Sequence, residues 1–128
     1  MSLYRYKADV VRVRDGDTVW MDIDLGFDIW LRNQSVRLLG IDTPEPSGDT
    51  REAAIPPRNR LIELLESADN SCIISTVRIT PAVIMPYRKI KERGKFGRIL
   101  AELFIEGEER SLNQILLDEG LAVVYAKR

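Results

Sequence analysis

The 128-residue sequence contains no histidine and a single cysteine, Cys72. Without histidine, the chain has no His-based triad, no histidine general base and no zinc site with imidazole ligands. One cysteine excludes an internal disulfide and a zinc site built on thiolates. The remaining catalytic residue types are Asp, Glu, Arg, Lys, Tyr, Ser and Thr, so carboxylates that bind oxygen-preferring cations are the chemistry to look for.

Long apolar runs are also missing. None approaches the ~20 residues that a helix needs to cross a bilayer, and residues 4–13 are too polar for the apolar region of a secretory signal. We therefore expect no membrane contact and favour a cytoplasmic protein, since one cysteine fits a reducing compartment. The alternative is a secreted protein whose signal has been removed.

Neither sign of charge dominates, because 19 basic residues stand against 20 acidic ones. Residues 88–98 are an exception: six cations and one anion give that segment a net charge of +5. The cations are Arg88, Lys89, Lys91, Arg93, Lys95 and Arg98. Such a run is either a surface that binds a polyanion or a solvated loop, and the charge alone favours the loop.

Length and composition predict one folded domain over residues 1–128. Hydrophobic residues make up 45% of the chain and charged residues 30%, which excludes a disordered or fibrous protein. Chains of roughly 100–150 residues usually form a single hydrophobic core. No repeat or linker divides this sequence, and we expect a monomer.

The first third of the chain predicts strands. Tyr6, Ala8 and Val10 alternate with polar residues, and then Val11 and Val13 continue in the opposite phase. This slip of one residue predicts a β-bulge. Strand-like alternation follows over residues 19–25, 27–31 and 36–41. Turns are expected at residues 15–16 and 26, with a break at residue 33.

The rest of the chain predicts two helices and two strands. Helical spacing of apolar residues predicts a helix near residues 57–68, whose start is limited by two prolines. Strands are expected over residues 72–79 and 99–105. A capping-box pattern at residues 111–114 predicts a second helix that ends at Gly120. This order predicts a mainly β, α+β fold, a five-stranded OB-fold barrel with two to three packed helices.

Arg37 is the first residue of chemical interest, because it interrupts the apolar run of residues 36–41. A buried unpaired charge is costly, so its guanidinium must reach an anion or solvent. One interpretation is an ion pair with a nearby carboxylate. The other is a fork for phosphate, which the planar guanidinium suits; from Arg37 alone the ion pair is favoured.

Two acidic segments supply candidate metal ligands. Asp42 and Glu45 flank Thr43 and Pro44, and the proline holds Thr43 extended. A hard cation can bind the Asp42 carboxylate and the Thr43 carbonyl together, although a plain turn explains the same residues. Asp17 follows the expected turn at residues 15–16 and is a second candidate carboxylate.

The segments Asp-Gly-Asp-Thr, Arg-Leu-Leu-Gly-Ile-Asp-Thr-Pro-Glu and Lys-Phe-Gly-Arg occur in this order. In them the sequence closely resembles the staphylococcal (thermo)nuclease family of OB-fold phosphodiesterases, from about Tyr6 to Tyr125. The resemblance implies a Ca²⁺-dependent endonuclease that hydrolyses single-stranded or frayed DNA and RNA. It also implies little sequence preference and products with 3′-phosphate and 5′-hydroxyl ends.

The resemblance also implies the roles of individual residues. Asp17, Asp42 and the Thr43 carbonyl are expected to bind Ca²⁺. Glu45 is the expected general base, and two arginines hold the scissile phosphate, so that the catalytic set is Arg37, Glu45 and Arg98. Lys95, Phe96 and Tyr125 match family positions that bind substrate. The basic run adds three further expected contacts with phosphates: Arg88, Lys89 and Lys91.

A non-catalytic OB-fold module that binds nucleic acid or protein is the alternative. Such relatives have lost the acidic constellation, whereas all five discriminating residues are present here, which favours hydrolysis. The set is Asp17, Arg37, Asp42, Glu45 and Arg98. Trp20 and Trp30 lie in alternating strands, so we interpret them as packing residues in the core or at its rim rather than as nucleotide-stacking residues.

Overall fold

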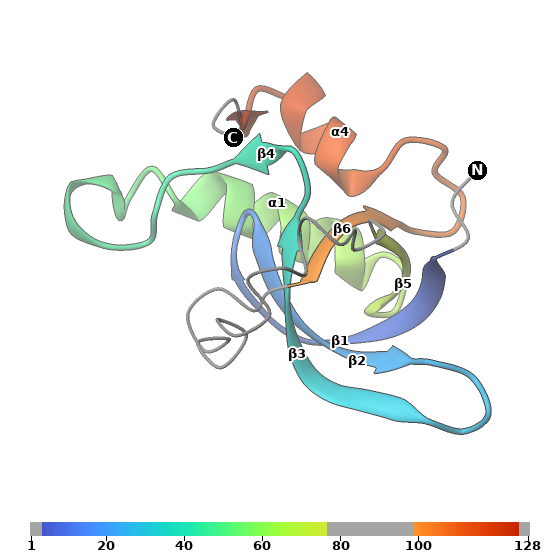
Figure 1. The fold of residues 1–128 in the computed structure, drawn as a ribbon. Coiled ribbons are helices and arrows are strands. Elements are labelled where there is room, and N and C mark those ends of the chain that lie inside the picture. The colour runs from blue at the N-terminus through green and yellow to red at the C-terminus, as the bar shows by residue number, and fades with distance from the viewer. Residues whose placement is uncertain (1–3, 77–98, 126–128) are drawn as a thin grey trace, which may run out of the picture.

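The computed structural model describes residues 4–76 and 99–125 of the chain. In chain order the elements are β1 (Arg5–Asp15), β2 (Thr18–Asp24), β3 (Trp30–Leu38), β4 (Ile41–Asp42), the 3₁₀ turn η1 (Gly48–Thr50), α1 (Ile55–Glu66), β5 (Ser71–Thr76), β6 (Ile99–Phe104), α4 (Leu112–Asp118) and β7 (Val123–Val124). Five strands close into a barrel in the order β1-β2-β3-β6-β5, and β4 pairs with β7 beside it (Figure 1). The predicted five-stranded barrel is confirmed.

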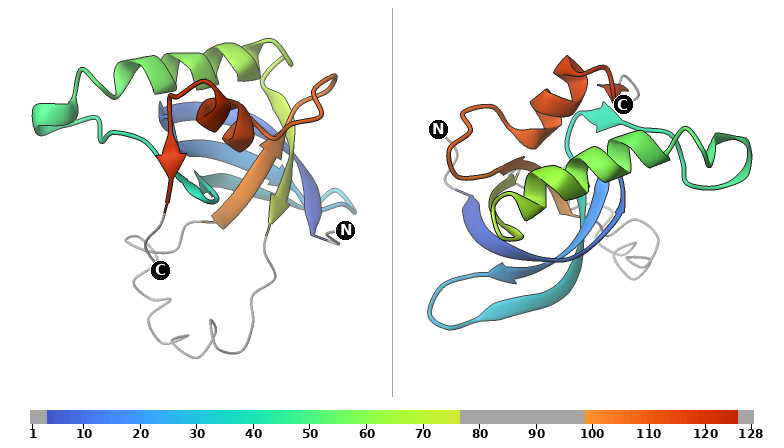
Figure 2. Two further views of the ribbon diagram at one scale, coloured as in Figure 1. Left: turned by 90° about the horizontal axis from the view of Figure 1, so that it is seen from above. Right: turned by 180° about the vertical axis from the view of Figure 1, so that it is seen from behind.

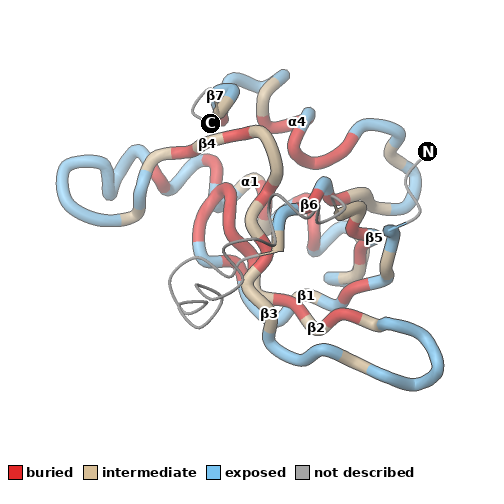
Figure 3. Tube along the Cα trace, in the orientation of Figure 1, coloured by how far each residue is buried: buried red, intermediate tan, exposed pale blue. Residues whose placement is uncertain are grey.

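The hydrophobic core fills the barrel because each strand turns alternate side chains inward. In β2, Val19, Met21 and Ile23 are fully buried, whereas Trp20 and Asp22 between them are only partly buried. Figure 3 shows that the buried stretches gather on the barrel strands and on the helices that face them. The apolar positions of the alternating sequence pattern therefore face the core, and the positions between them face the surface.

Two helices cover one side of the barrel, and the β2–β3 hairpin projects away from them (Figure 2). Helix α1 packs against β1, β5 and α4, and α4 packs against β6. The barrel closes through a parallel pairing in which Leu38 of β3 lies opposite Ala101 of β6, both buried. None of the helices in the described part of the chain has the length and apolarity needed to cross a membrane.

The predicted β-bulge lies in β1 and is confirmed. Val10 pairs with Met21, and Arg12 pairs with the next residue of β2, Trp20, so Val11 is the extra residue. A second irregularity follows between Val13 and the end of β1. The bulges bend β1 around the barrel.

The β2–β3 hairpin differs from the prediction. Phe27 and Ile29 were expected in a strand, but they lie in the connecting loop, where Phe27 is 97% exposed and has a φ of 57°. Asn33 does not break the strand; it lies inside β3 with a φ of 54°. The alternation of apolar and polar residues continues through the β2–β3 loop, because Phe27 and Ile29 are apolar. The periodicity therefore gave no sign of the turn.

The chain also divides where one strand was predicted over residues 36–41. Strand β3 ends at Leu38 and β4 begins at Ile41, because Gly40 takes a φ of 81° between them. Helix α1 begins at Ile55, two residues before the predicted start, and both prolines lie in its first turn, where no N–H bond is lost. Strand β5 ends at Thr76, and residues 77–79 of the predicted strand lie outside the described residues.

Helix α4 forms as predicted, with one difference at its start. The Ser111 hydroxyl accepts a hydrogen bond from the Gln114 N–H at 3.0 Å, which caps the helix. The Gln114 side chain does not return to the cap; its amide donates to Asp118 at 2.7 Å. Only one half of the capping box is therefore present. Gly120, with a φ of 74°, ends the helix as expected.

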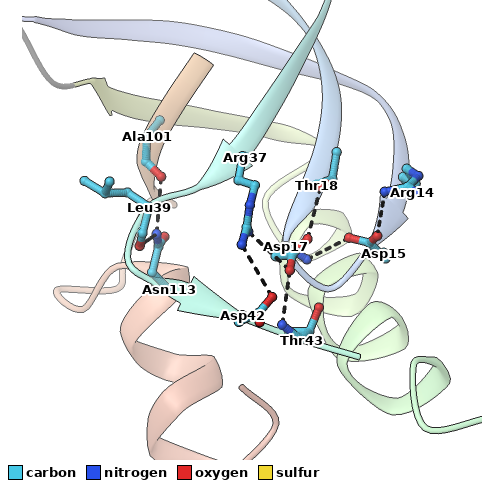
Figure 4. A network of polar contacts seen from close by, with 10 residues as sticks. All are labelled: Arg14, Asp15, Asp17, Thr18, Arg37, Leu39, Asp42, Thr43, Ala101 and Asn113. Atoms are coloured by element: carbon cyan, nitrogen blue, oxygen red, sulfur yellow. Dashed lines mark hydrogen bonds and ion pairs between the residues drawn. The ribbon is translucent and has the colours of Figure 1, made fainter. Parts of the chain in front are cut away.

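Asn113 attaches α4 to the barrel (Figure 4). Its side chain is buried and donates to the carbonyl oxygens of Leu39 at 2.8 Å and Ala101 at 3.2 Å. Its amide oxygen accepts the Leu103 N–H at 3.1 Å. One side chain thus satisfies main-chain groups of β6 and of the β3–β4 corner, which are costly to leave unpaired inside a protein.

We predict that Asn113→Leu lowers the free energy of unfolding by about 3 kcal/mol, because buried main-chain groups lose their partner at nearly unchanged side-chain volume. Gln114→Ala on the exposed side of the same helix is the control and should change it by no more than about 0.5 kcal/mol. Urea denaturation followed by circular dichroism measures both. Equal stability of the two variants would contradict the role given to Asn113.

Candidate active site

Segments far apart in the sequence meet beside the end of β3 (Figure 4). The turn between β1 and β2 supplies Asp15 and Asp17, and β3 supplies Arg37. Strand β4 supplies Asp42, and Thr43 follows it directly. The structure therefore brings together the predicted metal ligands and one of the two predicted catalytic arginines.

Arg37 lies between two carboxylates. Its Nη1 is 3.2 Å from Asp17 Oδ2, and its Nη2 donates to Asp42 Oδ1 at 3.4 Å. The Nη1 contact is an ion pair without hydrogen-bond geometry, so this buried nitrogen forms no hydrogen bond with any described residue. The side chain is 15% exposed. Arg37 is thus held by charge at the rim while part of its donor capacity remains for an anionic oxygen.

Asp17 is buried and receives several hydrogen bonds. The Thr43 N–H donates to Oδ2 at 3.1 Å and the Thr18 hydroxyl donates to Oδ1 at 3.0 Å. Burial by itself would raise the pKa of Asp17, but the hydrogen bond with Asp15, the charge of Arg37 and these donors outweigh it and lower the pKa. Asp17 is therefore the carboxylate of this turn that carries the negative charge.

Asp15 is the residue that the sequence prediction treated only as part of a turn. It is 2% exposed, its Oδ1 accepts the Asp17 N–H at 3.0 Å, and its Oδ2 accepts from Arg14 at 3.0 Å. Burial, followed by the hydrogen bond and charge of Asp17, raises the pKa of Asp15 to about 6. The sequence contained an indication of this burial: Asp15 stands two residues after the inward-facing Val13, so strand alternation directs it inward as well.

Gly16 allows the acidic turn to approach the rest of the site. A Cβ atom at this position would lie 2.7 Å from Pro57 Cβ and 2.9 Å from Thr43 Cγ2, closer than such atoms pack. The Leu38 N–H donates to the Asp17 carbonyl at 2.8 Å and fixes the other side of the turn. The glycine is needed for this close approach, in addition to its place in a turn.

Asp42, Thr43 and Glu45 differ in their exposure. The Asp42 side chain is 47% exposed, whereas Thr43 is buried and its Oγ1 has no hydrogen-bond partner among the described residues. Glu45 is exposed, and its carbonyl accepts the Thr50 hydroxyl at 2.6 Å. Within residues 4–76 and 99–125, the Glu45 carboxylate forms no hydrogen bond or ion pair. It is not placed in contact with Arg37.

Tyr125 reaches the same site from the other end of the chain. Strand β7 pairs with β4, and the Tyr125 N–H donates to the Gly40 carbonyl at 2.9 Å. The ring centre of Tyr125 is 5.3 Å from Arg37 Cζ, a cation–π contact. Tyr125 was expected to bind substrate, and the structure brings its ring against the guanidinium that is expected to hold the phosphate.

The other predicted site residues lie outside the described part of the chain. They are Arg88, Lys89, Lys91, Lys95, Phe96 and Arg98. Their expected roles remain predictions.

The donor chemistry at the site fits the expected Ca²⁺. Asp17 from the β1–β2 turn and Asp42 from β4 contact one guanidinium, and Thr43, whose buried Oγ1 has no partner among the described residues, follows Asp42 directly. These are oxygen donors, which hard cations prefer. No set of three Asp, Glu, Cys or His side chains that could hold a metal ion occurs in the described ranges. A cation here therefore depends on two carboxylates together with main-chain and water oxygens.

Comparison with known proteins adds two findings. The sequence model of a family described as "Staphylococcal nuclease homologue" matches residues 35–128. An uncharacterised protein from Methanocaldococcus jannaschii is 27% identical over 133 aligned positions, which cover 94% of this chain. The chain spans 59% of the length of that relative.

We predict that Asp15→Asn stabilises the metal-free protein at pH 7.5 but not at pH 4. A carboxyl whose pKa is higher in the folded protein than in the unfolded chain holds its proton more tightly when folded. Folding stability therefore falls as the pH rises from about 4 to above 6, and asparagine removes this loss. Urea denaturation in chelator at both pH values measures the difference.

Asp49→Asn, in the exposed turn η1, is the matched control and should leave stability nearly unchanged at both pH values. A gain for Asp15→Asn that is the same at pH 4 and pH 7.5 would show that the ionisation of Asp15 is not its source.

Proposed function

The chain belongs to the family of staphylococcal nuclease homologues, and from this premise we propose that it is a Ca²⁺-dependent endonuclease. Its substrates are DNA and RNA in single-stranded or frayed form, cut with little sequence preference. Its products carry 3′-phosphate and 5′-hydroxyl ends. The observation that carries the proposal is Arg37, a largely buried guanidinium with an unused Nη1 donor beside two carboxylates.

Arg37 is suited to stabilise the reaction of a phosphodiester. The substrate is an anion, and negative charge on its phosphoryl oxygens grows as water attacks. A guanidinium that Asp17, Asp42 and the Tyr125 ring already hold in place does not have to reorganise when that charge develops. We assign Arg98 the same role, as the family resemblance of its sequence motif implies.

Glu45 is the proposed general base. Its carboxylate is exposed and uncommitted within the described residues, three residues after Asp42, so it can accept the proton of a water molecule or orient it. A carboxylate in this position contributes roughly 10²- to 10⁴-fold to the rate. The engaged carboxylates Asp15 and Asp17 are less suited, because their oxygens already take part in hydrogen bonds.

Asp17, Asp42 and the Thr43 carbonyl are the proposed Ca²⁺ ligands. When bound, the ion would supply positive charge to the phosphoryl oxygens. The lowered pKa of Asp17 keeps that side chain ionised and ready to bind a cation at neutral pH. Asp42, at 47% exposure, can exchange its contact with Arg37 for another partner at little cost.

The proposed substrate contacts around the centre are sequence-independent. We assign Lys95 and Phe96 to the nucleotide beside the scissile phosphate, and Arg88, Lys89 and Lys91 to neighbouring backbone phosphates. Tyr125, which already lies on Arg37, would meet the same nucleotide. Contacts with phosphates and base faces give binding that weakens strongly with salt and distinguishes sequences poorly.

Digestion of single-stranded DNA in Ca²⁺, Mg²⁺ or chelator tests the reaction. We expect cleavage with Ca²⁺, little with Mg²⁺ because the irregular oxygen site does not supply a tight octahedron, and none in chelator. End-group analysis should find 3′-phosphates. Equal cleavage in chelator would contradict the metal dependence, and binding without cleavage under every condition would favour the non-catalytic module instead.

Glu45→Gln tests the proposed base. The amide keeps the size of the side chain but cannot take a proton, so kcat should fall by about 10²-fold or more while KM changes little. Glu52→Gln, at an exposed position of the same loop, is the matched control and should keep full activity. If steady-state kinetics give both variants the same kcat, Glu45 is not the base.

A further inference from the structure

The outer face of the barrel carries an arginine–tryptophan pair close to Arg37. Trp20 of β2 pairs with Arg12 of β1 on one side and with Ser35 of β3 on the other. Arg12 Cζ lies 5.3 Å from the centre of the Trp20 ring. The three residues form one row across the barrel, on the face opposite the core residue Val19.

This row is the next one after the row that contains Arg37. Arg37 pairs with Thr18, and Ser35 pairs with Trp20, so the two rows are two residues apart on the same side of β3. Two residues along a strand span about 7 Å. A nucleotide that continues from a phosphate held by Arg37 and turns across the barrel from β3 toward β1 would meet Trp20 and then Arg12, because neighbouring strands lie only about 4.8 Å apart.

Arg12 differs from Arg14 and Arg32 in having no carboxylate partner among the described residues. Arg32 also covers a tryptophan, Trp30, at 4.7 Å, but Asp22 neutralises it at 3.2 Å. Arg14 is paired with Asp15 at 3.0 Å. Arg12 is exposed and forms no ion pair with any residue in 4–76 or 99–125.

Trp20 has no evident structural need for its polar atom. Its indole Nε1 is buried and has no hydrogen-bond partner among the described residues, although a buried tryptophan usually finds one. What Trp20 provides is a flat ring that supports the guanidinium of Arg12. A guanidinium next to such a ring can offer its own plane to a base and its N–H groups to a phosphate.

We propose that Arg12 and Trp20 form a subsite for a neighbouring nucleotide of single-stranded DNA or RNA, other than the one assigned to Lys95 and Phe96. The Arg12 plane stacks with the base, its edge contacts the backbone, and Trp20 holds it in place. This subsite rests on the proposed nuclease function, since the substrate reaches it from Arg37. It extends the binding surface from the catalytic centre onto the outer face of β1, β2 and β3.

Arg12→Ala and Arg32→Ala are a matched pair, because each removes a guanidinium from above a tryptophan. The second lies about 17 Å from Arg37 along β3 and is already neutralised. In the Glu45→Gln background, the affinity for a fluorescein-labelled single-stranded trinucleotide is measured by anisotropy in Ca²⁺. We expect Arg12→Ala to weaken binding about 5- to 100-fold and Arg32→Ala to change it less than twofold. Arg12→Lys keeps the positive charge but lacks the planar group, so its affinity should lie between those of wild type and Arg12→Ala.

Tryptophan fluorescence gives a second readout that activity does not affect. The chain has two tryptophans, so Trp30→Phe leaves Trp20 as the only one. The oligonucleotide should quench Trp20 in that protein and should do so only weakly after Arg12→Ala. Equal affinities of the Arg12→Ala and Arg32→Ala proteins, or an unchanged Trp20 signal at saturation, would overturn the subsite.

Failure of the subsite and failure of the proposed function give different results. If the protein cleaves DNA normally while Arg12→Ala binds like wild type, the nuclease proposal stands and the subsite is wrong. If no cleavage occurs with any metal but binding depends on Arg12, the nucleic-acid subsite stands and hydrolysis is wrong. In the intact enzyme, Arg12→Ala should raise KM and leave kcat within about twofold.

Discussion

One buried amide joins helix α4 to the barrel at the corner where the candidate site begins. Asn113 bonds main-chain groups of Leu39 at the β3–β4 corner and of β6. Because α4 leads directly into β7, and β7 pairs with β4, the seating of this helix decides where Asp42 and Tyr125 lie. Arg37 can then contact both Asp42 of β4 and Tyr125, which follows β7. The site thus depends on a contact made by a residue that touches no site side chain.

The site also holds more buried charge than the fold requires. Asp15 and Asp17 lie two residues apart at one turn. Burial and then Asp17 raise the pKa of Asp15, whereas the hydrogen bond with Asp15 helps to lower the pKa of Asp17. Arg37 compensates Asp17 but leaves a buried donor unsatisfied. A hydrophobic replacement would suit the fold better, so the arrangement is typical of a site kept for its chemistry at some cost in stability.

The sequence predicted the barrel well because its core obeys a period of two. The phase slip at Val11 predicted the bulge, since an extra residue is the simplest way to move side chains to the other face. The same rule failed at Phe27, where apolar residues continue through a solvent-exposed turn. Burial of Asp15 and the contact of Tyr125 with Arg37 depend on how distant segments meet, which alternation along one strand does not encode.

Because positive and negative charges balance over the whole protein, binding of a polyanion must depend on local groups of unpaired cations. With 19 basic and 20 acidic residues, the protein has no general attraction for nucleic acid. Two other arginines of the described barrel surface are paired with carboxylates: Arg14 with Asp15 and Arg32 with Asp22. An ion pair of this kind presents almost no net charge to a phosphate, so counting cations overestimates the binding surface. Arg12, supported by an aromatic ring and lacking a carboxylate partner in the described ranges, is therefore the better candidate for extending the contact that begins at Arg37.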